Sequence, residues 1–111
     1  METKTAVAAL GALAHETRLD IFRLLVRAGA GGLAVGKIAE ALGVEANGRL
    51  SFHLKELVGA GLASARQEGR FIYYATDYAA MNELLHYLTE DCCGGQPCGE
   101  SIETCNPEQC A

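Results

Sequence analysis

The sequence lacks the two features that would direct it into or across a membrane. No run of about 18 apolar residues occurs in it. The N-terminal stretch METKTAVAAL also lacks the basic segment, apolar segment and cleavage site of a secretory signal. We therefore expect a cytoplasmic protein with no membrane partner. Because the cytosol is reducing, clustered cysteines there are more often metal ligands or redox groups than disulfides.

Lysine and arginine are absent from residues 77–111, which hold seven Asp and Glu and carry a charge of −7. Residues 1–76 hold all nine Lys and Arg against seven acids, which leaves a charge of +2. The net charge of −5 alone would argue against a nucleic-acid partner, but the division shows a mildly basic body and an acidic tail. With 111 residues, half of them hydrophobic, the chain can bury one core of ordinary size.

Signatures of catalysis are missing as well. No C-x-x-C motif stands in a βαβ setting, and no nucleophile, base and orienting group occur at a spacing typical of an active site. We therefore expect a protein that is not an enzyme. An ion-sequestering protein or an oxidoreductase with no role at DNA is the alternative class.

Apolar side chains recur at helical spacing in five segments of the chain. Residues 5–14 and 16–28 follow one another directly. Residues 35–42 and 47–61 are joined by the short connection VEA, which predicts a helix-turn-helix. The last helix is expected to begin after Asp77, which suits the N-cap position.

Between the last two helices the apolar period changes to that of a β-strand. LASARQEGRFIYYA, residues 62–75, alternates and then becomes rich in β-forming residues, with Glu68-Gly69 between the two runs. A hairpin fits best, with a type I turn in which Gly69 is left-handed. We therefore expect a mainly α, winged helix-turn-helix fold of five helices and a β-hairpin wing. Residues 1–91 would form this domain and residues 92–111 a cysteine-rich C-terminal segment.

Three stretches, ALAHETRLDIFRLL, SFHLKELVGAGL and EGRFIYYA, carry a family resemblance. Together they resemble the ArsR/SmtB family of bacterial metal-responsive repressors over about residues 8–90. The run S-x-H-L-x-x-L-x-x-A-G-L is the most specific part of the match. One departure is Glu16, where many members carry proline, and it changes only a helix start. The resemblance implies a repressor that binds double-stranded operator DNA as a homodimer.

The second helix of a helix-turn-helix enters the major groove, where its outward side chains reach bases and phosphates. With the leucines of this helix turned to the core, we expect the outward set to be Asn47, Arg49, Ser51, Phe52, His53 and Lys55. Arg66 and Arg70 flank the hairpin turn and would contact adjacent phosphates. The alternative is that these are ordinary solvated positions and that Phe52 packs on a neighbouring helix.

The first and last helices each carry an apolar stripe that one small core would struggle to cover. A second copy of the chain would cover the remainder, and the resemblance implies dimerisation through these same two helices. A twofold dimer would present two recognition helices to a palindromic operator. The alternative is that both stripes belong to the core of a monomer.

Three of the five cysteines, Cys92, Cys93 and Cys98, fall within seven positions. Vicinal Cα atoms lie ~3.8 Å apart, below the ~4.4 Å lower limit usual for a disulfide, so Cys92 and Cys93 are expected as thiols. For Cys98 to reach the same ion, the last helix must break after Cys93, and Gly94-Gly95 and Pro97 supply the break. Three thiolates fit trivalent arsenic better than zinc, which usually takes four ligands.

The resemblance narrows the choice of inducer, because arsenic-responsive members include a subgroup with this vicinal pair and a third cysteine. The C-x-C arsenic site of other members is absent from residues 35–42, and Ala79 and Glu90 stand where zinc-binding members hold histidines. The resemblance thus implies an As(III)-released repressor with a site at Cys92, Cys93 and Cys98. Antimonite, a methylated arsenical or another soft metal are the alternative inducers. A thiol redox switch that joins Cys93 and Cys98 is the other alternative.

Cys105 and Cys110 repeat the C-x4-C spacing of Cys93 and Cys98. Either could replace Cys98 as the third ligand, the pair could bind separately, or both could be incidental. The shorter loop to Cys98 costs less closure entropy and favours that residue.

Overall fold

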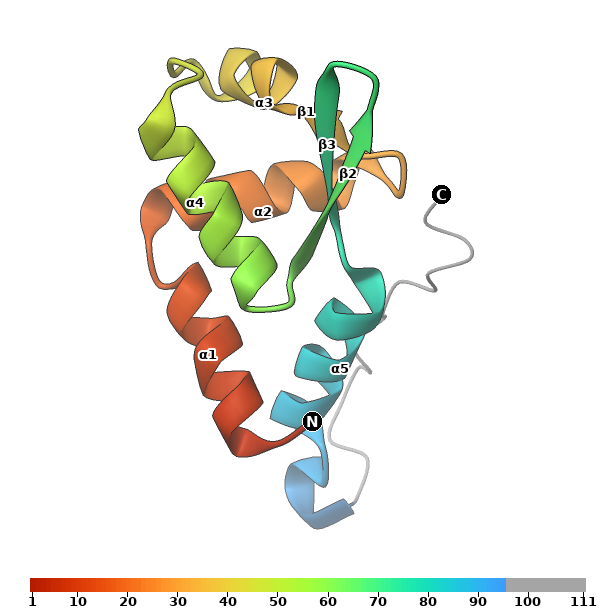
Figure 1. Cartoon of the computed structure of the whole chain (residues 1–111). Helices are drawn as coiled ribbons and strands as arrows, with labels where there is room; N and C mark the ends of the chain where they lie inside the picture. The colour runs from red at the N-terminus through yellow and green to blue at the C-terminus, as the bar shows by residue number, and fades with distance from the viewer. Residues whose placement is uncertain (96–111) are drawn as a thin grey trace.

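The computed structural model describes residues 1–95 and contains the five expected helices and the hairpin (Figure 1). In chain order the elements are α1 (Thr3–Leu13), α2 (Glu16–Ala28), β1 (Leu33–Ala34), α3 (Val35–Leu42), α4 (Gly48–Gly59), β2 (Ala63–Glu68), β3 (Phe71–Thr76), α5 (Tyr78–Thr89) and the 3-10 turn η1 (Cys92–Gly95). The predicted winged helix-turn-helix is confirmed, with α3 and α4 as its two helices and β2–β3 as the wing. No described helix is long and apolar enough to cross a membrane.

The sheet has three antiparallel strands in the order β1-β3-β2, so the wing gains a short strand that the sequence did not predict. Leu33 pairs with Tyr74 in β3, which ties the start of α3 to the wing. At the tip, Glu68 pairs with Phe71, so the reversal consists of Gly69 and Arg70. Gly69 has the expected positive φ of 62°, but it occupies the first turn position, where a type I turn requires a negative φ. The expected turn type was therefore wrong.

The core lies where α2, α3 and α4 meet the base of the wing. Its fully buried large side chains come from α2, α3, α4 and the residue before β2: Ile21, Leu25, Ile38, Leu54, Leu57 and Leu62. These residues recur at three- and four-residue intervals along α2 and α4, so one apolar face of each helix packs inward. The packing fixes the direction of α4 relative to α2 and the wing.

Figure 1 shows α1 and α5 together at the end of the molecule away from α3 and the wing tip. The buried face of α1 consists of small residues, Ala6, Ala9 and Ala12. The larger residues Val7 and Leu10 on the same helix are 62% and 41% exposed. The described chain therefore leaves much of the apolar stripe of α1 uncovered.

Candidate DNA-binding surface and thiol site

Asn47 defines where the recognition helix α4 begins. Its side-chain Oδ1 accepts hydrogen bonds from the backbone N–H groups of Arg49, at 3.0 Å, and Leu50, at 3.3 Å. This N-cap satisfies two donors that the first helical turn leaves without partners. The side-chain oxygen of Asn47, which would accept a hydrogen bond from adenine, is thus already used to cap the helix. A contact between Asn47 and DNA remains a prediction.

The exposed face of α4 carries most of the residues expected to meet DNA. Arg49 and Lys55 are exposed, Phe52 is 53% exposed and Ser51 is half-buried. An exposed aromatic ring between two cations suits a surface that contacts both phosphates and the apolar edge of thymine. The placement of these four residues agrees with the expectation, and their contacts with DNA remain predictions.

His53 is the exception on α4, because it is only 7% exposed. Its expected place on the outward face was wrong. His53 lies three residues after Leu50 and four before Leu57, which puts it on the buried face of the helix. The spacing of the leucines alone could have shown this, since a residue three or four positions from two buried leucines shares their face.

Two residues outside the helix-turn-helix hold His53. Arg18, in the first turns of α2, donates from Nε to Nδ1 of His53 at 3.1 Å, and its guanidinium carbon lies 5.5 Å from the centre of the Phe52 ring. The ring of His15, which precedes α2, lies 4.6 Å from that of His53, centre to centre. Sequence reasoning missed both residues, since no periodicity relates them to α4.

The electrostatic surroundings of His53 disfavour its charged form. Burial lowers the pKa of His53 below its ordinary value of 6.5, and the charges of His15, Arg18 and Arg49 act in the same direction. Glu56 alone opposes them. His53 is therefore a neutral imidazole at pH 7 that accepts a hydrogen bond through Nδ1.

The two wing arginines have different surroundings. Arg66 donates from Nη2 to the backbone carbonyl of Gly31 at 3.2 Å, pairs through Nε with Glu68 at 3.0 Å and lies over the Tyr73 ring. Arg70 is exposed at the tip of the wing and has no ion pair within the described residues. The structure thus leaves Arg70 better placed than Arg66 to reach a phosphate.

Cys92 and Cys93 lie in η1, immediately beyond the last long helix. Because α5 ends at Thr89, the helix breaks before this pair and not after Cys93, which corrects the expected position of the break. Asp91 and Cys93 both have a φ of 56°, so the chain reverses sharply at the thiols. Both cysteines are exposed, and their Sγ atoms are 3.7 Å apart.

The third expected ligand, Cys98, lies outside the described residues, as do Cys105 and Cys110. Within residues 1–95 no group of three or more His, Cys, Asp and Glu side chains comes together in a way that could hold a metal ion. Of the three expected ligands, the described part of the chain contains Cys92 and Cys93, and their binding of an ion remains a prediction.

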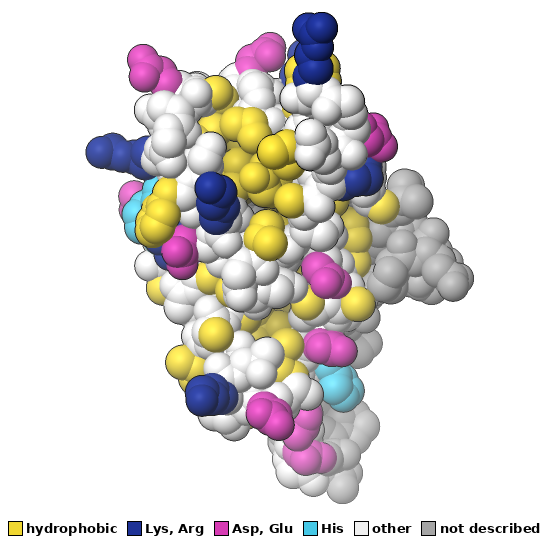
Figure 2. Space-filling model, viewed as in Figure 1, with side chains coloured by type: hydrophobic (Ala, Val, Ile, Leu, Met, Phe, Trp, Pro, Cys, Tyr) yellow, Lys and Arg dark blue, Asp and Glu magenta, His cyan; other side chains and the backbone are white. Residues whose placement is uncertain are grey.

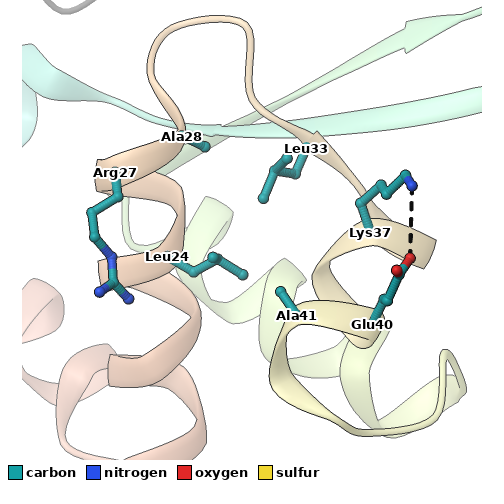
Figure 3. Close-up of a pocket in the computed structure, with 7 residues that line it drawn as sticks. All are labelled: Leu24, Arg27, Ala28, Leu33, Lys37, Glu40 and Ala41. Carbon is teal, nitrogen blue, oxygen red and sulfur yellow. Dashed lines mark ion pairs between the residues drawn. The ribbon is translucent and has the colours of Figure 1, made fainter.

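A separate apolar hollow lies between α2, β1 and α3 (Figure 3). Leu24, Ala28, Leu33 and Ala41 line it, and an ion pair between Lys37 and Glu40, 3.7 Å long, stands at its edge. Figure 2 shows hydrophobic side chains gathered on the upper part of the visible face, with Lys and Arg around them. The lining of the hollow contains no histidine, cysteine, serine or threonine.

Comparisons with known proteins agree with this architecture. The family model described as a helix-turn-helix domain matches residues 13–64. The solved structure of reduced HlyU from Vibrio cholerae is 35% identical in sequence to this chain and superposes with a TM-score of 0.61. The match covers 78% of this chain and 90% of the HlyU chain. No curated protein sequence matches the chain.

Two other solved structures describe regulators. A homodimeric winged helix-turn-helix DNA-binding domain from Mycobacterium bovis, described as a possible ArsR-family transcriptional regulator, is 29% identical over 87% of this chain and 89% of its own, with a TM-score of 0.60. The antimony-specific transcriptional repressor AntR is 30% identical over 74% of this chain and 72% of its own, with a TM-score of 0.59.

Proposed function

The chain belongs to the ArsR/SmtB family of winged helix-turn-helix transcriptional regulators, and from this premise we propose that it is an arsenite-responsive repressor. A homodimer binds operator DNA through α4 and the wing. Arsenite then binds Cys92, Cys93 and Cys98 of one subunit and releases the DNA. The proposal that the protein binds DNA rests on the winged helix-turn-helix fold. The proposal that arsenite is the inducer rests on the cysteine thiols.

The observation that carries the choice of inducer is the 3.7 Å separation of the Cys92 and Cys93 sulfurs. Metal–sulfur bonds of ~2.3 Å place two sulfurs on one ion no more than ~4.6 Å apart. The two sulfurs thus fit a shared soft ion with little rearrangement, and their exposure leaves room for a third thiolate. Trivalent arsenic takes three sulfurs in a pyramid and needs no histidine, and among residues 1–95 no histidine joins the pair in a possible metal site.

The dimer is supported by the apolar residues that the described chain leaves uncovered. Val7 and Leu10 on α1 are exposed, and Leu88 near the end of α5 is 54% exposed. The hydroxyls of Thr3 and Tyr87 are hydrogen bonded, which holds the start of α1 beside the end of α5. A second copy packed on these helices would bury the exposed side chains and pair the two α4 helices for a palindromic operator.

Release requires that arsenite bind the DNA-free and DNA-bound dimers with different affinities. The thiols stand directly beyond α5, so an ion that orders η1 acts on the end of a helix in the proposed dimer interface. A coupling free energy of ~1 to 3 kcal/mol would lower DNA affinity about 5- to 150-fold. By reciprocity, DNA must weaken arsenite binding by the same factor.

The test begins with a DNA duplex selected by the protein from a random-sequence library. Fluorescence anisotropy of that duplex is then measured with arsenite, with antimonite and with a mild oxidant added separately. Release by arsenite at the lowest concentration supports the proposal. Release by antimonite alone would instead favour an antimony sensor, the second candidate that the similarity to AntR raises. Release by the oxidant alone would favour a redox switch.

A further inference from the structure

Arg18 joins α2 to two consecutive residues of the recognition helix. Its Nε donates to Nδ1 of buried His53, while its guanidinium lies over the exposed ring of Phe52. A planar guanidinium can do both at once because its donors lie in the plane and its face stacks on an aromatic ring. Arg18 is itself half-buried, so these contacts are set by packing.

The hydrogen bond fixes the protonation state of His53. Arginine has only donors, so Nδ1 of His53 must present its lone pair, and the ring proton of the neutral form sits on Nε2. A second proton can bind only at Nδ1, the atom that accepts from Arg18. Protonation of His53 therefore removes the acceptor and sets two cations against each other at 3.1 Å.

Other charged groups around His53 do little to offset this conflict. His15 faces it from the segment before α2, and Arg49 and Glu56 face it from α4 itself. Glu45, from the connection before α4, lines the same small hollow as His53. Burial and the neighbouring cations together hold the pKa of His53 below 6.5 despite Glu56.

We propose that Arg18 is a positioning residue for DNA recognition, which aligns the start of α4 by holding neutral His53 and the Phe52 ring, and that acid abolishes this alignment. The inference rests on the DNA-binding part of the proposed function and is independent of arsenite. Loss of the Arg18–His53 bond lets the outward side chains of α4 shift from the base edges. Contacts with phosphates tolerate such a shift better, because the phosphate attraction is long-ranged and independent of sequence.

The distinguishing readout is the ratio of affinities for two duplexes as a function of pH. One duplex is selected from a random library at pH 8, and the other is its scrambled version. Anisotropy titrations at constant ionic strength run from pH 8 downward, to the lowest pH at which the protein stays folded. Protonation of surface histidines strengthens binding to any DNA, and the ratio cancels that effect. We expect the ratio to fall about tenfold, the factor that loss of one hydrogen bond to a charged group supplies.

Four variants separate positioning from charge. Arg18→Lys retains the cation but cannot present a planar donor beside a stacked face, so its ratio at pH 8 should be as low as that of Arg18→Gln. His53→Gln keeps an acceptor that does not titrate, so its ratio should no longer depend on pH. His86→Asn removes the exposed histidine of α5, which has no hydrogen bond or ion pair with Arg18 or His53 in the described structure, and should retain the pH dependence of the parent.

A ratio in the unaltered protein that stays constant or rises in acid would overturn the inference, whatever the variants do. A ratio of affinities for Arg18→Lys equal to that of the parent at pH 8 would also overturn the inference, because a positive charge at position 18 would then be sufficient. If no duplex is enriched at pH 8, the DNA-binding proposal fails together with it. An enriched duplex with a ratio independent of pH leaves the proposed function intact and refutes only the role of Arg18 and His53.

Discussion

The hydroxyl of Tyr78 donates a hydrogen bond to the backbone carbonyl of Val26, 2.7 Å away. Tyr78 is the first residue of α5 and is 5% exposed, while Val26 lies near the end of α2. The bond joins the start of the helix that ends near the thiols to the helix that supports α4. It provides one physical connection between the proposed inducer site and the DNA-binding surface.

Tyr78→Phe should lower the free energy of unfolding by about 1 kcal/mol, because it leaves the Val26 carbonyl without its donor. Urea unfolding at pH 7 measures this loss.

Burial raises the pKa of Tyr78 above 10.0, against the effect of a backbone hydrogen bond with Gly29. The unfolded phenol therefore ionises first as pH rises, so the parent should lose stability above pH ~10. An equal loss in Tyr78→Phe would remove Tyr78 as its cause.

The loop between α2 and β1 offers a matched pair of glycines. Gly32 has a φ of 71°, and a Cβ there would lie 2.3 Å from the carbonyl oxygen of Tyr74. A Cβ added at Gly31 would have no other heavy atom within 4 Å beyond its chain neighbours. We expect Gly32→Ala to cost on the order of 2 kcal/mol or more and Gly31→Ala to stay within about 0.5 kcal/mol of the parent. Urea unfolding compares the two, and similar values would contradict the close packing of this loop on β3.

Arg70→Ala should reduce the slope of log affinity against log salt by about one unit, because it removes one phosphate contact. Arg49→Ala should weaken binding to the selected duplex while the dimer stays intact. Arg27→Ala is the control, since this exposed arginine lies on α2 beside the apolar hollow. Anisotropy titrations at several salt concentrations measure all three. A slope for Arg70→Ala equal to that of the parent would place the wing tip away from DNA.

Leu88→Lys should dissociate the dimer at micromolar concentration, because it places a charge in the interface proposed for α1 and α5. Leu19→Lys is the control: Leu19 is 43% exposed but lies on α2. Sedimentation equilibrium gives the mass of each variant. A dimer in both variants would show that Leu88 lies outside the interface, and a monomeric parent would end the dimer proposal.

Most of the fold follows from local patterns that the sequence displays openly. The leucines of α4 and the β-forming residues after Gly69 mark the helix and the wing because each pattern repeats within one element. By contrast, β1 has only two residues, too few for any period to appear, and depends on pairing with β3. The exact reversal at Gly69-Arg70 depends on register across the hairpin, which no single strand records.

Some features of the candidate sites could likewise be predicted from the sequence, and others depend on the folded backbone and on packing. The vicinal cysteines are visible in the sequence, whereas the early end of α5 is set by the extended backbone of Glu90, a position that no glycine or proline marks. Arg18 acts on His53 from 35 positions away, so only the packing of α2 on α4 brings the two together. A polar residue at a buried position of a helix indicates such a partner, but it does not say where in the chain the partner lies.

The most direct test of the proposed inducer site is arsenite titration of the complex between the protein and its selected duplex, followed by anisotropy. The parent should release DNA, and a variant with Ser at both Cys105 and Cys110 should release it equally. Cys92→Ser and Cys93→Ser should bind DNA normally but fail to respond. If both single variants release DNA at the same arsenite concentration as the parent, the vicinal pair is not the inducer site and the central claim is wrong.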